Sequence, residues 1–452
     1  YLIRSLLDSQ RIYIKIMEHN KYYIETYGCQ MNVYDSELVG NLLDSSGYTK
    51  TDQVTDADAI FINTCAIREK AEDTVHNRLE SLHYLKKKNP SMIIGLLGCM
   101  AKNLKDGILE SKPYVDIILG PDSYRRIPEL IKERKENLNN IVDTKLSKFE
   151  LYEDIFPNRK TGINAWISIS RGCDKFCTFC IVPFTRGRER NRTMNSILDE
   201  AADAVSNGFS EITLLGQNVN SYRTDEGDFS VLLDKIALVP GVQRIRYTSP
   251  HPSDINDRVL EVMSKHQNIC NNIHLPLQAG SNYILNRMNR TYTRQEYLEL
   301  VDKIKKYMPD CTLSTDIIVG FPGESDENFE RTVEVMETVN FNSAFMFKYS
   351  SRPGTKAENF SDHIDEDIKQ KRLEKIIEVQ KKNTFKMNKK IIGTIQEVIV
   401  EKESKKSKSS WAGRTMGNTW VIFDKGNFKI KDKVKLIIYD AKGVSLFGKK
   451  LI

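Results

Sequence analysis

Three cysteines, Cys173, Cys177 and Cys180, lie within eight residues of the chain in the stretch RGCDKFCTFC. Thiolates in a set of three favour soft metal centres, chiefly iron–sulfur clusters or zinc. A structural zinc ion takes four closed ligands, and the nearest histidines in the sequence are the distant His83 and His251. A cubane of four irons bound by three cysteines instead leaves one iron open to a ligand from outside the protein. The spacing therefore favours an open iron–sulfur cluster, with a zinc site completed from elsewhere as the alternative.

Three further cysteines end three similar segments. The segments YYIETYGC, DAIFINTC and SMIIGLLGC close on Cys29, Cys65 and Cys99. Continuous apolar runs that alternate with helical segments predict parallel strands covered on both faces. The carboxyl ends of parallel strands lie at one edge of a sheet, where α/β proteins place their ligands. We therefore expect these three cysteines to meet at one edge, although they are far apart in the sequence.

Length and composition exclude some classes of protein. A chain of 452 residues predicts two or three globular domains. No apolar run approaches the roughly 20 residues that a membrane helix requires, and charges are dense in the first segment, unlike in an export signal. We expect a cytoplasmic protein with no membrane partner. In a reducing compartment clustered thiols are metal ligands or catalytic groups more often than disulfides.

The order of the elements predicts an α/β protein of three domains. Residues 21–140 have the pattern of a Rossmann-like parallel sheet, and residues 141–160, rich in turn formers, that of a linker. Over residues 161–388 six strand candidates alternate with helices, which predicts a partial (β/α)6 barrel. Residues 389–452 have the short alternating runs of a small all-β barrel. Residues 1–20 form an N-terminal extension without an assigned role.

The excess positive charge of the chain is concentrated in the last barrel. Residues 391–452 contain 13 Lys and Arg against 6 Asp and Glu, a net charge of +7, whereas the whole chain has a net charge of +6. This distribution is typical of a domain that binds a phosphate backbone. A solvated lysine surface without a partner is the alternative.

The cysteine motif resembles a known signature. Cys-x3-Cys-x2-Cys after an apolar strand resembles the motif of radical S-adenosylmethionine (SAM) enzymes. With YGCQMN, NTCAIREKAED, LLGCMA, LLGQNVNSY, HLPLQAGSNYILNRMNR and DIIVGFPGE, the chain from about residue 22 onward is similar to the methylthiotransferase family, and its terminal barrel is similar to the TRAM RNA-binding module. The resemblance implies two 4Fe-4S clusters. Cys173, Cys177 and Cys180 would hold the SAM-cleaving cluster, and Cys29, Cys65 and Cys99 an auxiliary, sulfur-carrying one.

The resemblance also implies a reaction. One SAM molecule methylates the sulfur, and a second is cleaved to a radical that abstracts hydrogen from an unactivated carbon, onto which the methylthio group is transferred. NTCAIREKAED and LLGQNVNSY resemble the branch that converts N6-isopentenyl(dimethylallyl)adenosine at tRNA position 37 to its 2-methylthio form. The alternatives are N6-threonylcarbamoyladenosine or a ribosomal-protein aspartate as substrate, or a noncatalytic iron–sulfur RNA-binding sensor. The implied partners are a tRNA anticodon stem-loop and an electron donor such as flavodoxin or ferredoxin, and we expect a monomer.

Polar residues just past the barrel strands are candidate SAM or substrate ligands, with tight turns or buried structural roles as the alternative. These are Gly216, Gln217, Asn218, Ser249, His274, Gln278 and Asp316. Five arginines are candidate RNA contacts: Arg186, Arg188, Arg190, Arg192 and Arg414. The first four alternate along TRGRERNR, so they share one face if the segment is extended and spread around it if the segment is helical.

Overall fold

The computed structural model describes residues 20–65 and 69–451, which fall into two compact units. Unit 1 contains the described residues up to Lys160 together with Val182–Arg188, and unit 2 contains Thr161–Ile181 and the described residues from Glu189 onward. The predicted extension 1–20 lies outside the described residues except for Asn20. Each unit is described by itself.

Unit 1 is built on a six-stranded sheet in which every neighbouring pair is parallel. The strand order is β2-β1-β3-β4-β5-β6. The strands are β1 (Lys21–Tyr27), β2 (Thr49–Lys50), β3 (Ala59–Thr64), β4 (Ile93–Gly98), β5 (Ile117–Leu119) and β6 (Ile141–Asp143). The central strands β3 and β4 are buried at every position, which explains their continuous apolar runs.

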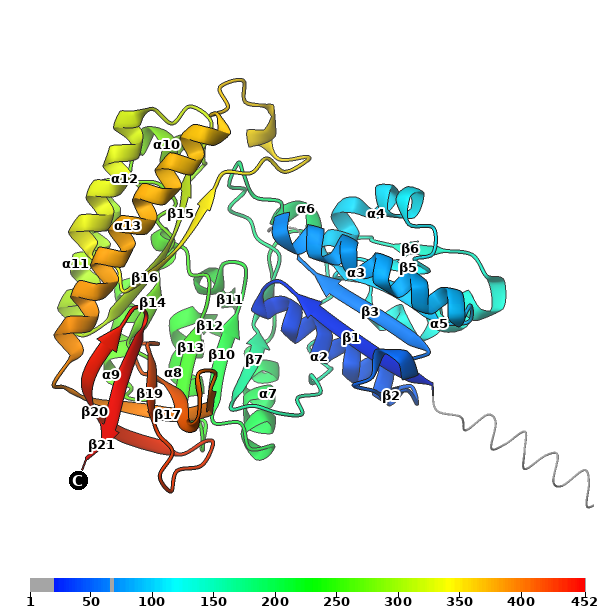
Figure 1. Cartoon of the computed structure of the whole chain (residues 1–452), viewed down its shortest axis with the longest axis horizontal. Coiled ribbons are helices and arrows are strands. Elements are labelled where there is room, and N and C mark those ends of the chain that lie inside the picture. The colour runs from blue at the N-terminus through cyan, green and yellow to red at the C-terminus, as the bar shows by residue number, and fades with distance from the viewer. Residues whose placement is uncertain (1–19, 66–68, 452) are drawn as a thin grey trace, which may run out of the picture. The chain divides into compact units, whose positions relative to one another are not determined.

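Helices cover both faces of this sheet (Figure 1). The helices α2 (Gln30–Ser45) and α5 (Ile127–Asn137) pack on the face that carries Phe61. The helices α3 (Glu69–Lys88) and α4 (Cys99–Ser111) pack on the face that carries Ile60 and Ile62. Two short 3-10 helices, η1 (Val54–Asp56) and η2 (Tyr124–Arg126), complete the unit. The predicted Rossmann-like parallel-sheet domain is confirmed.

The segment 141–160, predicted as a linker, is instead part of unit 1. Its first residues form β6, which pairs with β5. Tyr152 is fully buried, and its hydroxyl donates to the carbonyl of Pro121 and accepts from the amide of Tyr124. The linker interpretation was wrong because a three-residue strand and one buried tyrosine produce no readable hydrophobic period.

Unit 2 contains two three-stranded parallel sheets, in the orders β13-β10-β7 and β14-β15-β16. The strands are β7 (Asn164–Ser168), β10 (Glu211–Leu215), β13 (Arg244–Tyr247), β14 (Asn272–His274), β15 (Thr312–Val319) and β16 (Ser343–Lys348). The helices between and after them are α7 (Met194–Ser206), α8 (Phe229–Ala237), α9 (Asp257–Lys265), α10 (Asn282–Arg287), α11 (Arg294–Tyr307), α12 (Asp326–Val339) and α13 (Glu366–Ile391). All six strands coincide with the predicted candidates, and the alternation is that of a partial (β/α)6 barrel.

Shorter elements connect these strands. The pair β8 (Ser170–Arg171) and β9 (Arg190–Asn191) is antiparallel, as is the pair β11 (Arg223–Thr224) and β12 (Gly227–Asp228). The 3-10 helices are η3 (Val219–Ser221), η4 (Pro252–Asp254) and η5 (Lys356–Asn359). Between β8 and β9 the chain forms the cysteine loop and then the helix α6 (Val182–Arg186), which is counted with unit 1.

The end of the chain forms a closed five-stranded barrel in the order β17-β18-β19-β21-β20. Its strands are β17 (Ile395–Ser404), β18 (Ser407–Thr415), β19 (Trp420–Asp424), β20 (Lys433–Lys442) and β21 (Ser445–Lys450). Val398, Val400 and Leu436 lie in its small apolar core. The predicted all-β barrel is confirmed. Among the described residues, no helix is long and apolar enough to cross a membrane.

Candidate functional site

The structure places Cys29, Cys65 and Cys99 at one edge of the sheet of unit 1. In the strand register Tyr27 is opposite Thr64, which is opposite Gly98, so β1, β3 and β4 end level with one another. Cys65 and Cys99 come directly after the last paired residues, and Cys29 precedes the first turn of α2. Gly28 approaches Cys65 so closely that an added Cβ would lie 2.7 Å from its Sγ. Three strand ends therefore bring together thiols that are 36 and 34 residues apart in the sequence.

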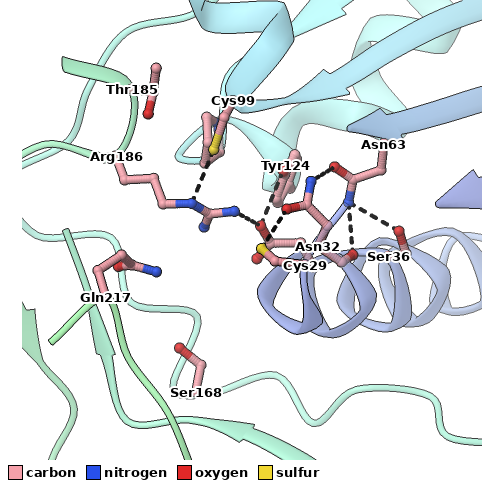
Figure 2. Close-up of polar contacts among 12 residues, drawn as sticks. Cys29, Asn32, Ser36, Asn63, Cys99, Tyr124, Ser168, Thr185, Arg186 and Gln217 are labelled. Atoms are coloured by element: carbon pink, nitrogen blue, oxygen red, sulfur yellow. Dashed lines mark hydrogen bonds and ion pairs between the residues drawn. The ribbon is translucent and has the colours of Figure 1, made fainter. Parts of the chain in front are cut away.

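A buried guanidinium lies beside one of these cysteines, Cys99 (Figure 2). Arg186 of α6 donates from Nε to Sγ of Cys99 at 3.2 Å and from Nη2 to Oδ2 of Asp35 at 2.9 Å. Arg186 is 3% exposed and Asp35 is fully buried. Burial disfavours the charged guanidinium, but Cys99 and Asp35 outweigh it and hold the pKa of Arg186 well above its ordinary value. Unit 1 therefore presents a fixed positive charge beside its thiols.

Two buried asparagines fix the backbone around these thiols (Figure 2). Asn32 of α2 donates to the side-chain oxygen of Asn63 in β3 at 3.0 Å, and Asn63 donates in return to the carbonyl of Asn32 at 3.0 Å. Cys29 contacts the amide oxygen of Asn32, with 3.1 Å between Sγ and Oδ1. Gly98 has a φ of +91°, and an added Cβ there would lie 2.5 Å from Oδ1 of Asn63. These contacts leave the edge little freedom to rearrange.

The other three cysteines lie in the loop of unit 2 that follows β8. The amide of Cys180 donates to the carbonyl of Cys177 at 3.0 Å, which makes a tight turn. Burial raises the pKa of Cys173 to about 11. Arg290 donates from Nη1 to Sγ of Cys177 at 3.4 Å, and Asn289 donates to the carbonyls of residues 175 and 176. The loop is thus held by two residues more than 100 positions away, which the sequence interpretation did not identify.

The donors of both sets suit an iron–sulfur centre. Across residues 20–65 and 69–451, no three Cys, His, Asp or Glu side chains are grouped so as to hold a single metal ion. Sulfur donors suit iron–sulfur clusters, and such a cluster with three thiolates is anionic. A guanidinium that donates to a thiol in each set, Arg186 and Arg290, would stabilise an anionic group. The residues present fit 4Fe-4S clusters.

Three predicted cofactor ligands brace the cysteine loop of unit 2. The side-chain oxygen of Gln217 accepts from the amide of Gly172 at 2.6 Å. Asn218 donates to Asp254 at 2.7 Å, and Asp254 also pairs with Lys175 of the loop at 2.8 Å. At Gly216 an added Cβ would lie 2.6 Å from Oγ of Ser170. These contacts give the turn after β10 a positioning role, and its contact with SAM stays a prediction.

Two other predicted ligands lie together. His274 of β14 and Asp316 of β15 are 3.2 Å apart between Nε2 and Oδ2, and Nδ1 of His274 is 3.0 Å from Oγ of Ser314. Gln278 has a φ of +68° and bonds to β15 through its backbone, donating to the carbonyl of Asp316. Ser249 has a φ of +57°, and its carbonyl accepts from the amide of Val219. Contacts of all four with SAM or substrate stay predictions.

The alternating arginines lie neither along one extended segment nor in one helix, the two arrangements that the sequence leaves open. Arg186 ends a helix, Gly187 turns with a φ of +76°, and Arg190 lies in a strand. Arg186, Arg190 and Arg192 are buried, and Arg192 pairs with the buried Glu200. Their burial is not compatible with the predicted phosphate contacts in this conformation. Arg188 is exposed, and its contact with RNA stays a prediction.

Arg414 connects the terminal barrel to the rest of unit 2. It donates to Glu401 of its own barrel at 2.7 Å and to Glu211, the first residue of β10, at 3.1 Å. Arg244 and Arg246 of β13 donate to the carbonyls of Arg414 and Thr415 at 2.8 and 2.9 Å. The guanidinium of Arg414 is thus bound within the protein, and its contact with RNA stays a prediction.

Comparison with known families gives three matches along the chain. Residues 21–120 match the family described as "Uncharacterized protein family UPF0004", and residues 167–336 match the radical SAM superfamily. Residues 389–451 match the TRAM domain. Each cysteine triad lies within one of the first two matches, and the basic barrel is the third.

Relatives are similar over nearly the whole chain. A tRNA-2-methylthio-N(6)-dimethylallyladenosine synthase of Bacteroides fragilis is 46% identical over 96% of this chain and 96% of its own length. A synthase of the same name from Christiangramia forsetii is 44% identical over 97% of this chain and 95% of its own. Among solved structures, the radical SAM methyltransferase TsrM of Kitasatospora setae has a TM-score of 0.57 at 12% identity, covering 75% of this chain and 77% of its own. That last likeness concerns the fold alone.

Proposed function

Because this chain belongs to the family of the tRNA-2-methylthio-N(6)-dimethylallyladenosine synthases, we propose that its two cysteine triads hold two 4Fe-4S clusters with separate tasks in that reaction. The chain is a radical SAM transferase that converts dimethylallyladenosine in tRNA to its 2-methylthio form. When bound, the cluster of unit 2 supplies the electron that cleaves SAM, and the cluster of unit 1 supplies the sulfur. Two SAM molecules are used, one as methyl donor and one as radical source.

The edge of unit 1 carries this proposal. Three thiolates impose negative charge on a site whose cysteines are largely removed from water, and such charge is costly without a partner. Arg186 supplies a positive charge at hydrogen-bond distance from Cys99, and Asp35 orients its guanidinium. The asparagine pair fixes the backbone on which Cys29 and Cys65 are carried. Cys29, Cys65 and Cys99 would bind three corners of a cluster and leave the fourth corner for sulfur.

In unit 2 the protein keeps the cysteine loop in a defined shape. Gln217 holds the start of the loop, Lys175 and Asp254 its middle, and Asn289 the turn at Phe176, which has a φ of +47°. Arg290 donates to the thiol of Cys177. These contacts come from three segments that are far apart in the sequence, and together they fix the shape of the loop. Such preorganisation would hold Cys173, Cys177 and Cys180 ready for a cluster, which would supply an iron for SAM.

The terminal barrel supports tRNA as the partner. Its net charge of +7 would attract a phosphate backbone, and the ion pairs of Arg414 hold it to the strands of unit 2. We propose that it binds the anticodon stem-loop outside the target base. We also propose flavodoxin or ferredoxin as electron donor, a monomeric enzyme and a cytoplasmic location.

The direct test uses the full chain, reconstituted anaerobically with iron and sulfide. It is incubated with SAM, reductant and one of two stem-loop RNAs that carry dimethylallyladenosine or threonylcarbamoyladenosine at the target position. We expect methylthiolation of the first RNA only, measured by mass spectrometry of the nucleosides. Product on the threonylcarbamoyl RNA alone would show that threonylcarbamoyladenosine is the substrate of this chain. Absence of deoxyadenosine in every reaction would favour a noncatalytic sensor.

A further inference from the structure

Two large aromatic side chains on β16 face away from the core of unit 2. Phe345 is 54% exposed and Phe347 is 39% exposed. Ala344 and Met346, which alternate with them, pack against the core. Side chains on a strand alternate between the two faces of the sheet, so both phenylalanines share the opposite face. Neighbouring exposed aromatic rings of this kind mark a surface that contacts a ligand.

The same face carries the polar pair described above. Asp316 on β15 is the register partner of Phe345. The rings of His274 and Phe345 meet edge to face, with 5.9 Å between their centroids. His274 in turn contacts Asp316 at 3.2 Å. Phe345 is therefore the apolar neighbour of two residues that the sequence predicts as ligands of cofactor or target base.

We propose that Phe345, with Phe347 beside it, contacts the dimethylallyl group of the target adenosine and sets the specificity for that group. This inference rests on the proposed function, which supplies an adenosine with a branched, uncharged five-carbon substituent. Contact with aromatic rings removes such an apolar group from water, which favours binding. The rings are already exposed on a fixed strand, so little has to rearrange when the group binds.

The charges on this face favour the same occupant. Asp316 presents a carboxylate next to Phe345, and the described residues of β14, β15 and β16 that share the face include no Lys or Arg. A threonylcarbamoyl group carries its own carboxylate, which would be desolvated against phenyl rings and placed near that of Asp316. The face thus combines attraction for an apolar substituent with rejection of an acidic one.

The test measures binding and SAM cleavage separately in the reconstituted full chain. Dissociation constants are measured for two stem-loop RNAs, with dimethylallyladenosine or plain adenosine at the target position. We expect the wild type to prefer the dimethylallyl RNA and Phe345→Ala to lose roughly 10- to 100-fold of that preference. Phe345→Leu, which stays apolar, should restore most of it. Deoxyadenosine formation without RNA is measured in both variants, so that an effect on SAM is separated from an effect on RNA binding.

Phe385→Ala is the matched control, because Phe385 on α13 is 55% exposed and lies against Lys389. It should leave the preference unchanged. An unchanged preference in Phe345→Ala would overturn the inference. Loss of SAM cleavage without RNA would also overturn it, because Phe345 would then contact SAM and not the dimethylallyl group. If the wild type binds the dimethylallyl RNA preferentially without methylthiolating it, the proposed function is wrong, whereas the contact of Phe345 with the dimethylallyl group is still supported.

Discussion

The two cysteine triads are positioned in different ways. In unit 2 one loop of eight residues supplies all three cysteines, and distant side chains shape that loop. In unit 1 three separate strand ends each supply one cysteine, so the sheet itself fixes their spacing. A local loop can be adjusted by the residues that touch it, whereas a site at a sheet edge depends on the whole unit.

The two triads share one feature. Arg186 donates to Cys99 and Arg290 donates to Cys177, so each set of thiols has a guanidinium within hydrogen-bond distance. Arg186 comes from α6, whereas Arg290 comes from the segment after α10. The comparison predicts that the triads can be disabled independently, and that they respond differently to strain and to acid.

The largest effect is expected from removal of a single ligand in each triad. Cys177→Ala should abolish reductive cleavage of SAM, because the loop of unit 2 then lacks one of the three thiolates that hold its cluster. Cys65→Ala should leave cleavage intact and prevent methylthio transfer, because only the sulfur-carrying site is lost. Deoxyadenosine and methylthio nucleoside are measured in the same reactions. Methylthio product from the Cys65 variant would show that the assigned division of tasks is wrong.

Backbone strain should disturb unit 1 alone. Gly98→Ala forces a side chain onto a φ of +91°, with its Cβ 2.7 Å from the carbonyl of Thr64. We expect a loss of about 1–3 kcal/mol in the stability of unit 1 and reduced iron binding there. Iron is counted in chains whose unit 2 cysteines are replaced by alanine. Gly107→Ala, in the helix α4 that follows Gly98, has open space around its added Cβ; it is the control and should bind iron like its parent.

Loss of the positive charge at the edge of unit 1 should change the midpoint potential of the unit 1 cluster and not the amount of iron bound there. Arg186→Met removes a cation and a hydrogen bond to Cys99. The more negative, reduced cluster would therefore be destabilised relative to the oxidised one. The midpoint potential should fall by about 60 mV, equivalent to roughly 1.4 kcal/mol for one electron. A redox titration followed by electron paramagnetic resonance measures it, again without the unit 2 cysteines. Arg186→Lys should recover part of the shift, and the exposed Arg188→Met none; equal potentials in all variants would refute this role.

The smallest expected effect is a loss of the stability of unit 2 at acidic pH. Burial, with Arg290 and Lys175 nearby, lowers the pKa of His251 to about 2. Below the ordinary pKa of about 6.5 the unfolded chain therefore binds a proton that the folded chain does not, and stability falls as the pH falls. Between pH 6.5 and 5.5 the loss approaches about 1 kcal/mol. Urea unfolding at several pH values measures it.

In that experiment His251→Asn should flatten the dependence of stability on pH between 6.5 and 5.5. His363→Asn, at an exposed position of the same unit, should not. A pH dependence that stays the same in both variants would mean that His251 is protonated in the folded chain.

Local patterns in the sequence predicted much of this architecture. The strands that precede Cys65 and Cys99 could be predicted because buried parallel strands are continuously apolar. The loop triad could be predicted because its three cysteines lie within eight residues. The strand β6 was missed, because three residues carry no period.

Contacts across long sequence distances could not be predicted. Arg186 lies 87 residues from Cys99, and Arg290 lies 113 residues from Cys177. No local pattern indicates such a partner, and only the fold brings it to the thiol. The conformation of the arginine-rich segment could not be predicted for a related reason. An extended segment and a helix are each one regular conformation, whereas this segment passes from helix through Gly187 to strand.

The central claim, two clusters in one chain, is tested most directly by counting iron and acid-labile sulfide per chain after anaerobic reconstitution. The account predicts about eight of each in the wild type. It predicts about four after alanine replaces Cys29, Cys65 and Cys99, and about four after it replaces the unit 2 triad. About four irons in the wild type, all lost with one triad, would contradict it.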